Sequence, residues 1–178
     1  MGPTQINGLP AHVLLVHVVV VVIPLAALAL VLSVTWPAAQ RRLGVVTPLL
    51  ALVGLVFVPV TTHAGEWLAA RLGTSPAIAH HVQIGHDLLP WAVVLFVVAL
   101  AHWLWARATR RAAVTVADRP SGGGVAVAER TTTATPTRVK VGNAVFVVVG
   151  VAAAVVAVWM TYRIGDSGAK AAWTGIVR

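Results

Sequence analysis

Residues 11–34 read AHVLLVHVVVVVIPLAALALVLSV, and this stretch decides the fold class. It contains no Asp, Glu, Lys or Arg, and the whole of residues 1–40 shares that absence. A helix crosses a hydrocarbon core about 30 Å thick with about 20 apolar residues, and it satisfies its own backbone hydrogen bonds, which an open strand cannot do in lipid. We therefore expect a membrane-spanning helix here, although valine favours strands in water.

Three more runs without charged residues follow, and they cover residues 43–65, 88–106 and 141–162. Soluble domains carry about a quarter charged residues, whereas this chain is 10% charged and 58% hydrophobic. Four such runs argue against a soluble helical protein and predict an all-α, integral membrane four-helix bundle. The expected spans are residues 11–34, 44–63, 77–105 and 141–162. Kinks are expected at the prolines inside these spans, Pro24, Pro48, Pro59 and Pro90.

The positive charge lies mostly between the spans. The chain has 13 basic and 5 acidic residues, a net charge of +8. Arg41 and Arg42 separate the first two spans, and seven basic residues lie between the last two. The positive-inside rule places both loops in the cytoplasm and both termini outside, in the plasma membrane of a bacterium. Lipid is then the partner that explains the charge, and nucleic acid is not needed.

Three segments follow from this topology. Residues 1–105 hold the first three spans with a histidine cluster at their outer face. Residues 106–140, with the runs SGGG and TTTATPT, are expected to be a flexible basic cytoplasmic linker. Residues 141–178 hold the fourth span and an outer C-terminal tail, whose Arg163, Lys170 and Arg178 fit the charge rule less well.

Several kinds of chemistry are excluded by composition and motifs. The chain has no Cys, which removes disulfides, thiolate metal sites, covalent haem attachment and cysteine nucleophiles. It also lacks the G-x-S-x-G, H-E-x-x-H, P-loop and Rossmann patterns. We therefore expect no independent catalytic activity.

The seven histidines are the most informative polar residues. Six of them fall at the outer ends of the first three spans: His12, His17, His63, His80, His81 and His86. Only His102 falls at the cytoplasmic end. At about 1.5 Å per residue, His17 and His81 lie at matched depths below the starts of their helices. Ionisable groups at membrane depth usually face the bundle interior, and they are candidates for a functional site.

Three interpretations of this cluster stay open. In the first, the protein transfers electrons through a b-type haem held by His17 and His81, with His12 as the other choice from the first helix. Gly85 shares a helix face with His81 and would let a flat macrocycle or another helix approach closely.

In the second interpretation the cluster binds a zinc, copper or iron ion. The expected ligands are His12, His17, Glu66, His81 and His86. In the third, the chain binds no cofactor and is an accessory subunit of a larger membrane complex, in which the histidines make interhelical hydrogen bonds. The sequence also leaves open whether the protein has a redox partner and whether copies of the chain associate with one another.

Three stretches carry a family resemblance: LPAHVLLVHVVVVVIPLAAL at residues 9–28, THAGEWLAARLG at 62–73 and AHHVQIGHDLLPW at 79–91. They resemble the bacterial membrane family called domain of unknown function 2231, over about residues 8–105. No activity is established for that family. Some relatives look fused to Rieske or cytochrome c modules, which implies a redox, respiratory neighbourhood.

The resemblance extends to individual positions. The matching residues are His12, His17, Ala64, Gly65, Glu66, His81, Gly85, Pro90 and Trp91. The chain departs from the family pattern at His86, where an acid is expected directly after the glycine, because here the acid comes one residue later, at Asp87. A ligand role for His86 therefore has less support than one for His81.

Overall fold

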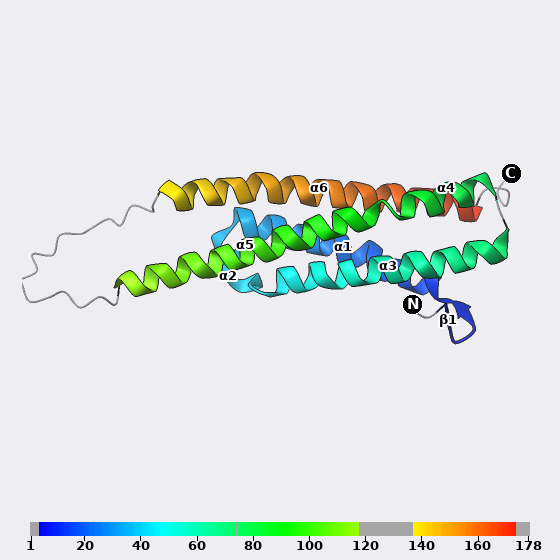
Figure 1. Ribbon diagram of the computed structural model, residues 1–178, viewed down its shortest axis with the longest axis horizontal. Helices are drawn as coiled ribbons and strands as arrows, with labels where there is room; N and C mark the ends of the chain where they lie inside the picture. The colour runs from blue at the N-terminus through cyan, green and yellow to red at the C-terminus, as the bar shows by residue number, and fades with distance from the viewer. Residues whose placement is uncertain (1–3, 74, 118–136, 174–178) are drawn as a thin grey trace, which may run out of the picture.

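The computed structural model describes residues 4–73, 75–117 and 137–173. The long helices are α1 (Ala11–Thr35), α3 (Val46–Leu72), α5 (Leu88–Ala117) and α6 (Thr137–Trp173). Shorter elements are β1 (Gln5–Ile6), β2 (Leu9–Pro10), α2 (Pro37–Leu43) and α4 (Pro76–Gly85). Four stretches are long and apolar enough to cross a membrane: Ala11–Thr35, Val46–Leu72, Pro76–Ala112 and Thr137–Trp173. The prediction of four long apolar helices in a bundle is confirmed (Figure 1).

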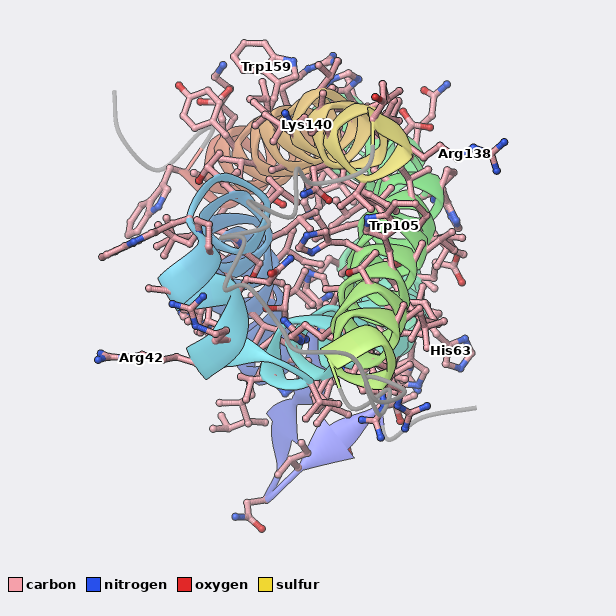
Figure 2. All side chains as sticks on the ribbon, turned by 90° about the vertical axis from the view of Figure 1, so that its left-hand side faces the viewer. Arg42, His63, Trp105, Arg138, Lys140 and Trp159 are labelled. Atoms are coloured by element: carbon pink, nitrogen blue, oxygen red, sulfur yellow. The ribbon has the colours of Figure 1, made fainter. Side chains whose placement is uncertain are left out.

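The long helices form a ring in which α1 and α5 face each other across α3 and α6 (Figure 2). Neighbouring helices run antiparallel. In the first half of α6, Gly150 packs against Val34 near the end of α1, and Asn143 near the start of α6 accepts a hydrogen bond from Trp105 in the second half of α5. The start of α1 and the end of α6 therefore lie at the same end of the bundle, as in an up-down-up-down arrangement.

Small residues fill much of the bundle interior, and many of the large apolar ones lie outside. Alanines are prominent among the buried residues: Ala26, Ala51, Ala92, Ala99 and Ala157. Among the described residues, only Ile23, Leu30 and Leu95 are both large and fully buried. Meanwhile Val21 is 62% exposed and Val148 is 70% exposed. Small residues let helix backbones approach closely, which is the packing mode of helices in lipid.

The third expected span, residues 77–105, is interrupted between α4 and α5 at His86 and Asp87. Pro90 explains the break, because it has no N–H to bond to the carbonyl of His86 and its ring crowds that carbonyl. The His86 carbonyl instead accepts from the N–H of Leu89, at 3.3 Å. By contrast, α1 runs through Pro24 and α3 through Pro59 without a break.

The expected linker is partly helical. Helix α5 continues to Ala117 and α6 begins at Thr137, so both ends of residues 106–140 belong to helices. The tail expected after residue 162 is also helical, as far as Trp173. The expected spans ended where the apolar runs end, at the first charged residues. Charged residues do not end a helix, so α5 and α6 extend beyond the expected limits. Residues 118–136 and 174–178 lie outside the described residues.

Two small elements were not predicted. Strands β1 and β2 pair antiparallel around Asn7 and Gly8, whose φ angles are 50° and 78°. Asn-Gly is the preferred pair for a two-residue hairpin turn, because both positions need positive φ. The short helix α2 begins with Pro37 in its first turn and carries Arg41 and Arg42. The hairpin precedes α1, whereas α2 lies in the connection between α1 and α3.

Candidate functional site

His12 lies near the start of α1 and faces α3. Its Nδ1 lies 2.9 Å from the carbonyl oxygen of Thr61. Because a carbonyl only accepts, Nδ1 carries the proton in this bond. In the neutral imidazole the other nitrogen, Nε2, then keeps its lone pair. His12 is therefore held in the tautomer that can bind a metal through Nε2.

His81, in α4, is held in the same way by α6. Its Nδ1 lies 2.8 Å from Oγ of Ser167. The hydroxyl of Ser167 donates its own proton to the carbonyl of Ile164, also at 2.8 Å. Ser167 thus has only a lone pair to offer, and Nδ1 of His81 must be the donor. As in His12, Nε2 of the neutral ring is left with its lone pair.

The two imidazole rings meet inside this end of the bundle. Their centroids are 6.1 Å apart and their planes make an angle of 74°. Each ring also lies over a glycine. A Cβ at Gly65 in α3 would be 2.8 Å from Nδ1 of His12, and one at Gly168 in α6 would be 3.0 Å from Cε1 of His81. Four helices, α1, α3, α4 and α6, thus build this histidine pair.

Thr61, one turn before Gly65 in α3, has a buried hydroxyl. Thr61 is only 6% exposed, and its Oγ1 has no hydrogen-bond partner among the described residues. Its neighbour Thr62 instead donates to the carbonyl of Val58. A buried polar atom without a partner costs about 1–3 kcal/mol. Thr61 thus anchors His12 through its carbonyl and also carries a hydroxyl that has the capacity to bind a further polar group.

His17 does not join this pair. Its side chain is exposed, and its Nδ1 lies 2.6 Å from the carbonyl oxygen of Val13 on its own helix. The structure therefore brings His12 to His81 in place of His17, the residue expected first. At Gly85 a Cβ would meet no atom of another helix within 4 Å, so no helix makes a close approach there, and its role beside a cofactor stays a prediction. The glycines that allow close approach to the rings are Gly65 and Gly168.

Glu66 and His86 form a separate cluster with His63. Nε2 of His86 lies 2.9 Å from one oxygen of Glu66, and Nδ1 of His63 lies 4.0 Å from the other. These side chains line a cavity of about 170 Å³ together with Pro59, Thr62 and Leu89. The sequence suggested a structural pair of His86 with Asp87, but the carboxylate that His86 contacts is that of Glu66.

The five expected metal ligands are thus divided among three places. Over residues 4–73, 75–117 and 137–173, no group of three or more His, Asp or Glu side chains has the arrangement of a metal site. His12 and His81 lie together, Glu66 and His86 lie together, and His17 faces outward. The hydrogen-bond partners of the two rings are the carbonyl of Thr61 for His12 and the hydroxyl of Ser167 for His81, and neither is a carboxylate.

The seventh histidine, His102, belongs to the opposite end of the bundle. It is 4% exposed, and its Nε2 lies 3.0 Å from Nε2 of Gln40. Oε1 of Gln40 accepts from Arg110 at 3.4 Å, so the amide nitrogen of Gln40 donates to His102. This partly buried network links α2 to α5 and has a structural role.

Sequence reasoning missed Thr61, Ser167 and Gly168 as parts of the histidine site. Ser167 and Gly168 fall beyond the fourth expected span, in a segment that was read as a tail. Helical continuity through the charged residues 163–170 brings them to His81. No local signal marks them, because their role depends on the packing of α6 against α4.

Comparison with protein-family models, curated proteins and solved structures finds no match to this chain. The chemistry of the site must therefore be judged from its geometry. Two neutral imidazoles with anchored Nδ1 atoms offer two lone pairs from different helices. That arrangement is suited to holding a metal centre that needs two protein ligands.

Proposed function

We propose that the four helices cross a bacterial plasma membrane, with the arginine-rich end in the cytoplasm and the histidine pair toward the outer face. Two features support this proposal. Large valine and leucine side chains cover the outside of the bundle, where a soluble protein rarely exposes a contiguous apolar surface. Most of the described basic residues lie in α2, in the second half of α5 and at the start of α6, among them Arg42, Arg138 and Lys140, which Figure 2 labels, and the positive-inside rule assigns that end to the cytoplasm.

We further propose that His12 and His81 would hold a b-type haem and that the protein transfers electrons. The observation that carries this proposal is the matched state of the two rings, each with Nδ1–H bonded to an oxygen and Nε2 left as a ligand. A haem iron needs only two protein ligands, because the macrocycle supplies the other four. A bare zinc ion would need three or four.

The spacing of the rings fits this assignment. Imidazole nitrogens bind metals at about 2.0–2.1 Å. The centroids of the two rings are 6.1 Å apart, so both imidazoles are close enough to hold one metal centre. When bound, haem supplies one-electron chemistry.

The surrounding residues have defined roles in this proposal. The carbonyl of Thr61 and the hydroxyl of Ser167 fix the ring tautomers and orientations, which raises the basicity of each Nε2. Gly65 and Gly168 provide the flat helix faces on which the rings lie. The partly buried position of both rings would help to tune the reduction potential.

The test is a visible spectrum of the detergent-purified protein from haem-replete cells. We expect a Soret band that shifts on reduction and is lost in His12→Ala and in His81→Ala. His17→Ala is the matched control, because it removes an exposed imidazole from the same helix and should keep the band. Circular dichroism confirms that each variant is folded. A colourless wild-type protein, or equal loss of the band in all three variants, would refute the assignment.

A transition-metal ion is the second candidate, and the orphaned hydroxyl of Thr61 favours it. Oγ1 of Thr61 could add an oxygen ligand to the two imidazoles. In that case the colourless protein would contain one equivalent of zinc, copper or iron by elemental analysis. Thr61→Val would then lower the metal content, whereas it should leave a haem spectrum almost unchanged.

The family resemblance and the accessory-subunit interpretation stay predictions. A haem site would agree with the redox neighbourhood that the resemblance to domain of unknown function 2231 implies. A protein with neither haem nor metal would instead favour an accessory subunit of a membrane complex. In that case the bonds of His12 and His81 to α3 and α6 would serve helix packing alone.

A further inference from the structure

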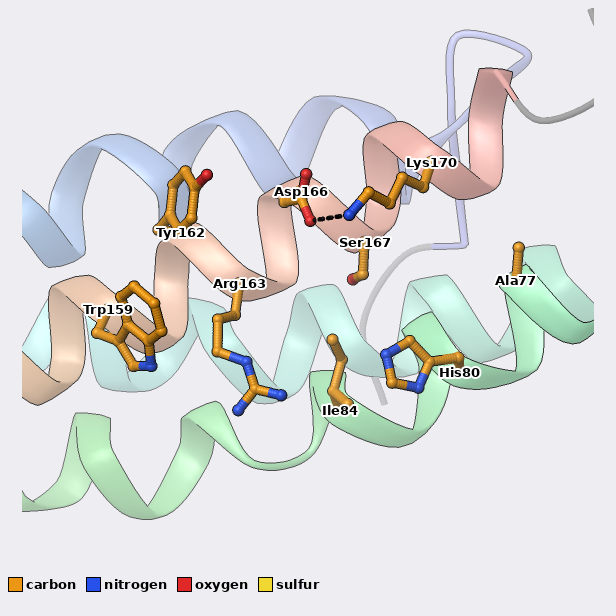
Figure 3. Close-up of a pocket in the computed structure, with 9 residues that line it drawn as sticks. All are labelled: Ala77, His80, Ile84, Trp159, Tyr162, Arg163, Asp166, Ser167 and Lys170. Atoms are coloured by element: carbon orange, nitrogen blue, oxygen red, sulfur yellow. Dashed lines mark hydrogen bonds and ion pairs between the residues drawn. The ribbon is translucent and has the colours of Figure 1, made fainter.

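A second cavity lies on the outside of the bundle, between α4 and α6, at the same end as the histidine pair. Its volume is about 410 Å³, which is in the range of small-molecule sites. The residues that line it are Ala77, His80, Ile84, Trp159, Tyr162, Arg163, Asp166, Ser167 and Lys170 (Figure 3). The cavity is distinct from the ring contact, although Ser167 takes part in both.

Arg163 supplies the charge in this groove. Figure 3 shows its side chain reaching into the space between α6 and α4, level with Ile84. It forms no hydrogen bond or ion pair with any other described residue. A guanidinium has five N–H donors and is always charged, so it is suited to bind a phosphate with two parallel hydrogen bonds.

The other charges of the groove nearly cancel. Nζ of Lys170 lies 2.7 Å from Oδ2 of Asp166, one turn earlier on α6. With Arg163 included, two cations and one carboxylate leave a net charge of +1. The carboxylate of Asp166 would repel a multiply charged anion. A ligand with a single negative charge therefore matches the groove best, and the imidazole of His80 can add a further hydrogen bond.

The groove also crosses a change in polarity along α6. Residues 141–162 carry no charge, and Arg163 is the first charged residue after them. Trp159 and Tyr162 lie on the apolar side, with their rings 5.9 Å apart and both largely exposed. Exposed Trp and Tyr side chains are typical of the membrane–water interface. The ligand should therefore have a charged head and an apolar body.

We propose that this groove binds the phosphodiester headgroup of an anionic phospholipid from the outer leaflet. Arg163 binds the phosphate, and an acyl chain lies along Trp159 and the exposed Val155 of α6. A monoanionic lipid such as phosphatidylglycerol balances the net charge of the groove. A zwitterionic lipid such as phosphatidylcholine brings a second cation beside Arg163. The proposal rests on the membrane insertion proposed above and is independent of haem.

The test is native mass spectrometry of the detergent-purified full chain with added lipid. Wild-type protein should retain phosphatidylglycerol in preference to phosphatidylcholine. Arg163→Gln should weaken phosphatidylglycerol binding about 10-fold or more, since a hydrogen-bonded ion pair is lost. Arg163→Lys should keep part of the binding, because it keeps the charge without the planar fork. Arg42→Gln, at the opposite end of the bundle, is the matched control and should bind like wild type.

The source of the phosphate is tested separately. Inorganic phosphate at millimolar concentration should not displace phosphatidylglycerol, because it lacks the apolar body. Displacement by inorganic phosphate, equal retention of both lipids, or equal loss of binding in Arg42→Gln and Arg163→Gln would each overturn the proposal. Arg163 takes no part in the hydrogen bonds that anchor Nδ1 of His12 and Nδ1 of His81. The visible spectrum of Arg163→Gln is therefore recorded alongside. An unchanged spectrum with weakened lipid binding separates this proposal from that for the histidine pair.

Discussion

Replacing Gly65 by alanine tests how closely α3 approaches the ring of His12. The new methyl carbon would lie 2.8 Å from Nδ1 and 2.9 Å from Cε1 of that ring. Non-bonded heavy atoms prefer about 3.5–4.0 Å. The ring must therefore move by about 0.7 Å or more to remove the overlap. Nδ1 is also the atom that holds the Thr61 carbonyl at 2.9 Å, and a shift of that size would break this bond.

The energy of the change follows from three effects. The lost hydrogen bond costs about 1 kcal/mol, and the strain of overpacking costs about 1–3 kcal/mol. The higher helix propensity of alanine returns about 1 kcal/mol. We expect Gly65→Ala to lower the free energy of unfolding by about 1–3 kcal/mol. Displacement of the ring also moves Nε2 of His12, which should weaken the binding of haem or metal in addition.

The measurement is thermal unfolding in detergent, followed by circular dichroism and by the visible spectrum. Each kcal/mol should lower Tm by about 2–4 °C for a chain of this size. Gly85→Ala is the matched control, because a Cβ at Gly85 meets no atom within 4 Å. It should keep the wild-type spectrum and leave Tm unchanged or higher. If Gly65→Ala is as stable as Gly85→Ala, the close packing of His12 on α3 is wrong.

Two further predictions concern the opposite end of the bundle and the topology. Oγ of Ser33 and Oγ1 of Thr47 form a buried hydrogen bond of 3.1 Å, so Ser33→Ala and Thr47→Val should each cost about 1–3 kcal/mol. In a thermal double-mutant cycle the double variant should cost less than the two together, and additive costs would argue against the bond. Because the chain has no Cys, single cysteines report topology without background. An impermeant maleimide should label Gln83→Cys in intact cells and Arg42→Cys only after permeabilisation, and labelling of both in intact cells would contradict the proposed orientation.

Part of the site could be predicted from the sequence, because it depends on position along each helix. Counting residues from the helix starts placed His12 and His81 near one end of the bundle, and the structure brings their rings together there. The choice between His12 and His17 could not be made in this way. The two are about 140° apart around α1, and only one of them can face α4. The sequence of α1 is apolar on every side, so it does not show which face turns inward.

The same limit applies to Glu66 and Gly85. Glu66 meets His86 because Pro90 interrupts the third span and leaves His86 at the break between α4 and α5. Proline positions can be read from a sequence, but four prolines were expected to disturb helices and only Pro90 separates two of them. The surrounding packing decides which helix accommodates the missing bond. For Gly85, no neighbouring helix comes close enough to use the space.

The sequence by itself determined that this chain forms four long apolar helices and that most of its histidines lie at one end. Both follow from local properties, since the length of an apolar run and the position of a residue along a helix do not depend on neighbours. Only the tertiary structure decided that His12 and not His17 meets His81, and that Gly65, Ser167 and Gly168 complete the pair. The rotation of each helix is set by the fit of small side chains between helices far apart in the sequence, which no single helix encodes.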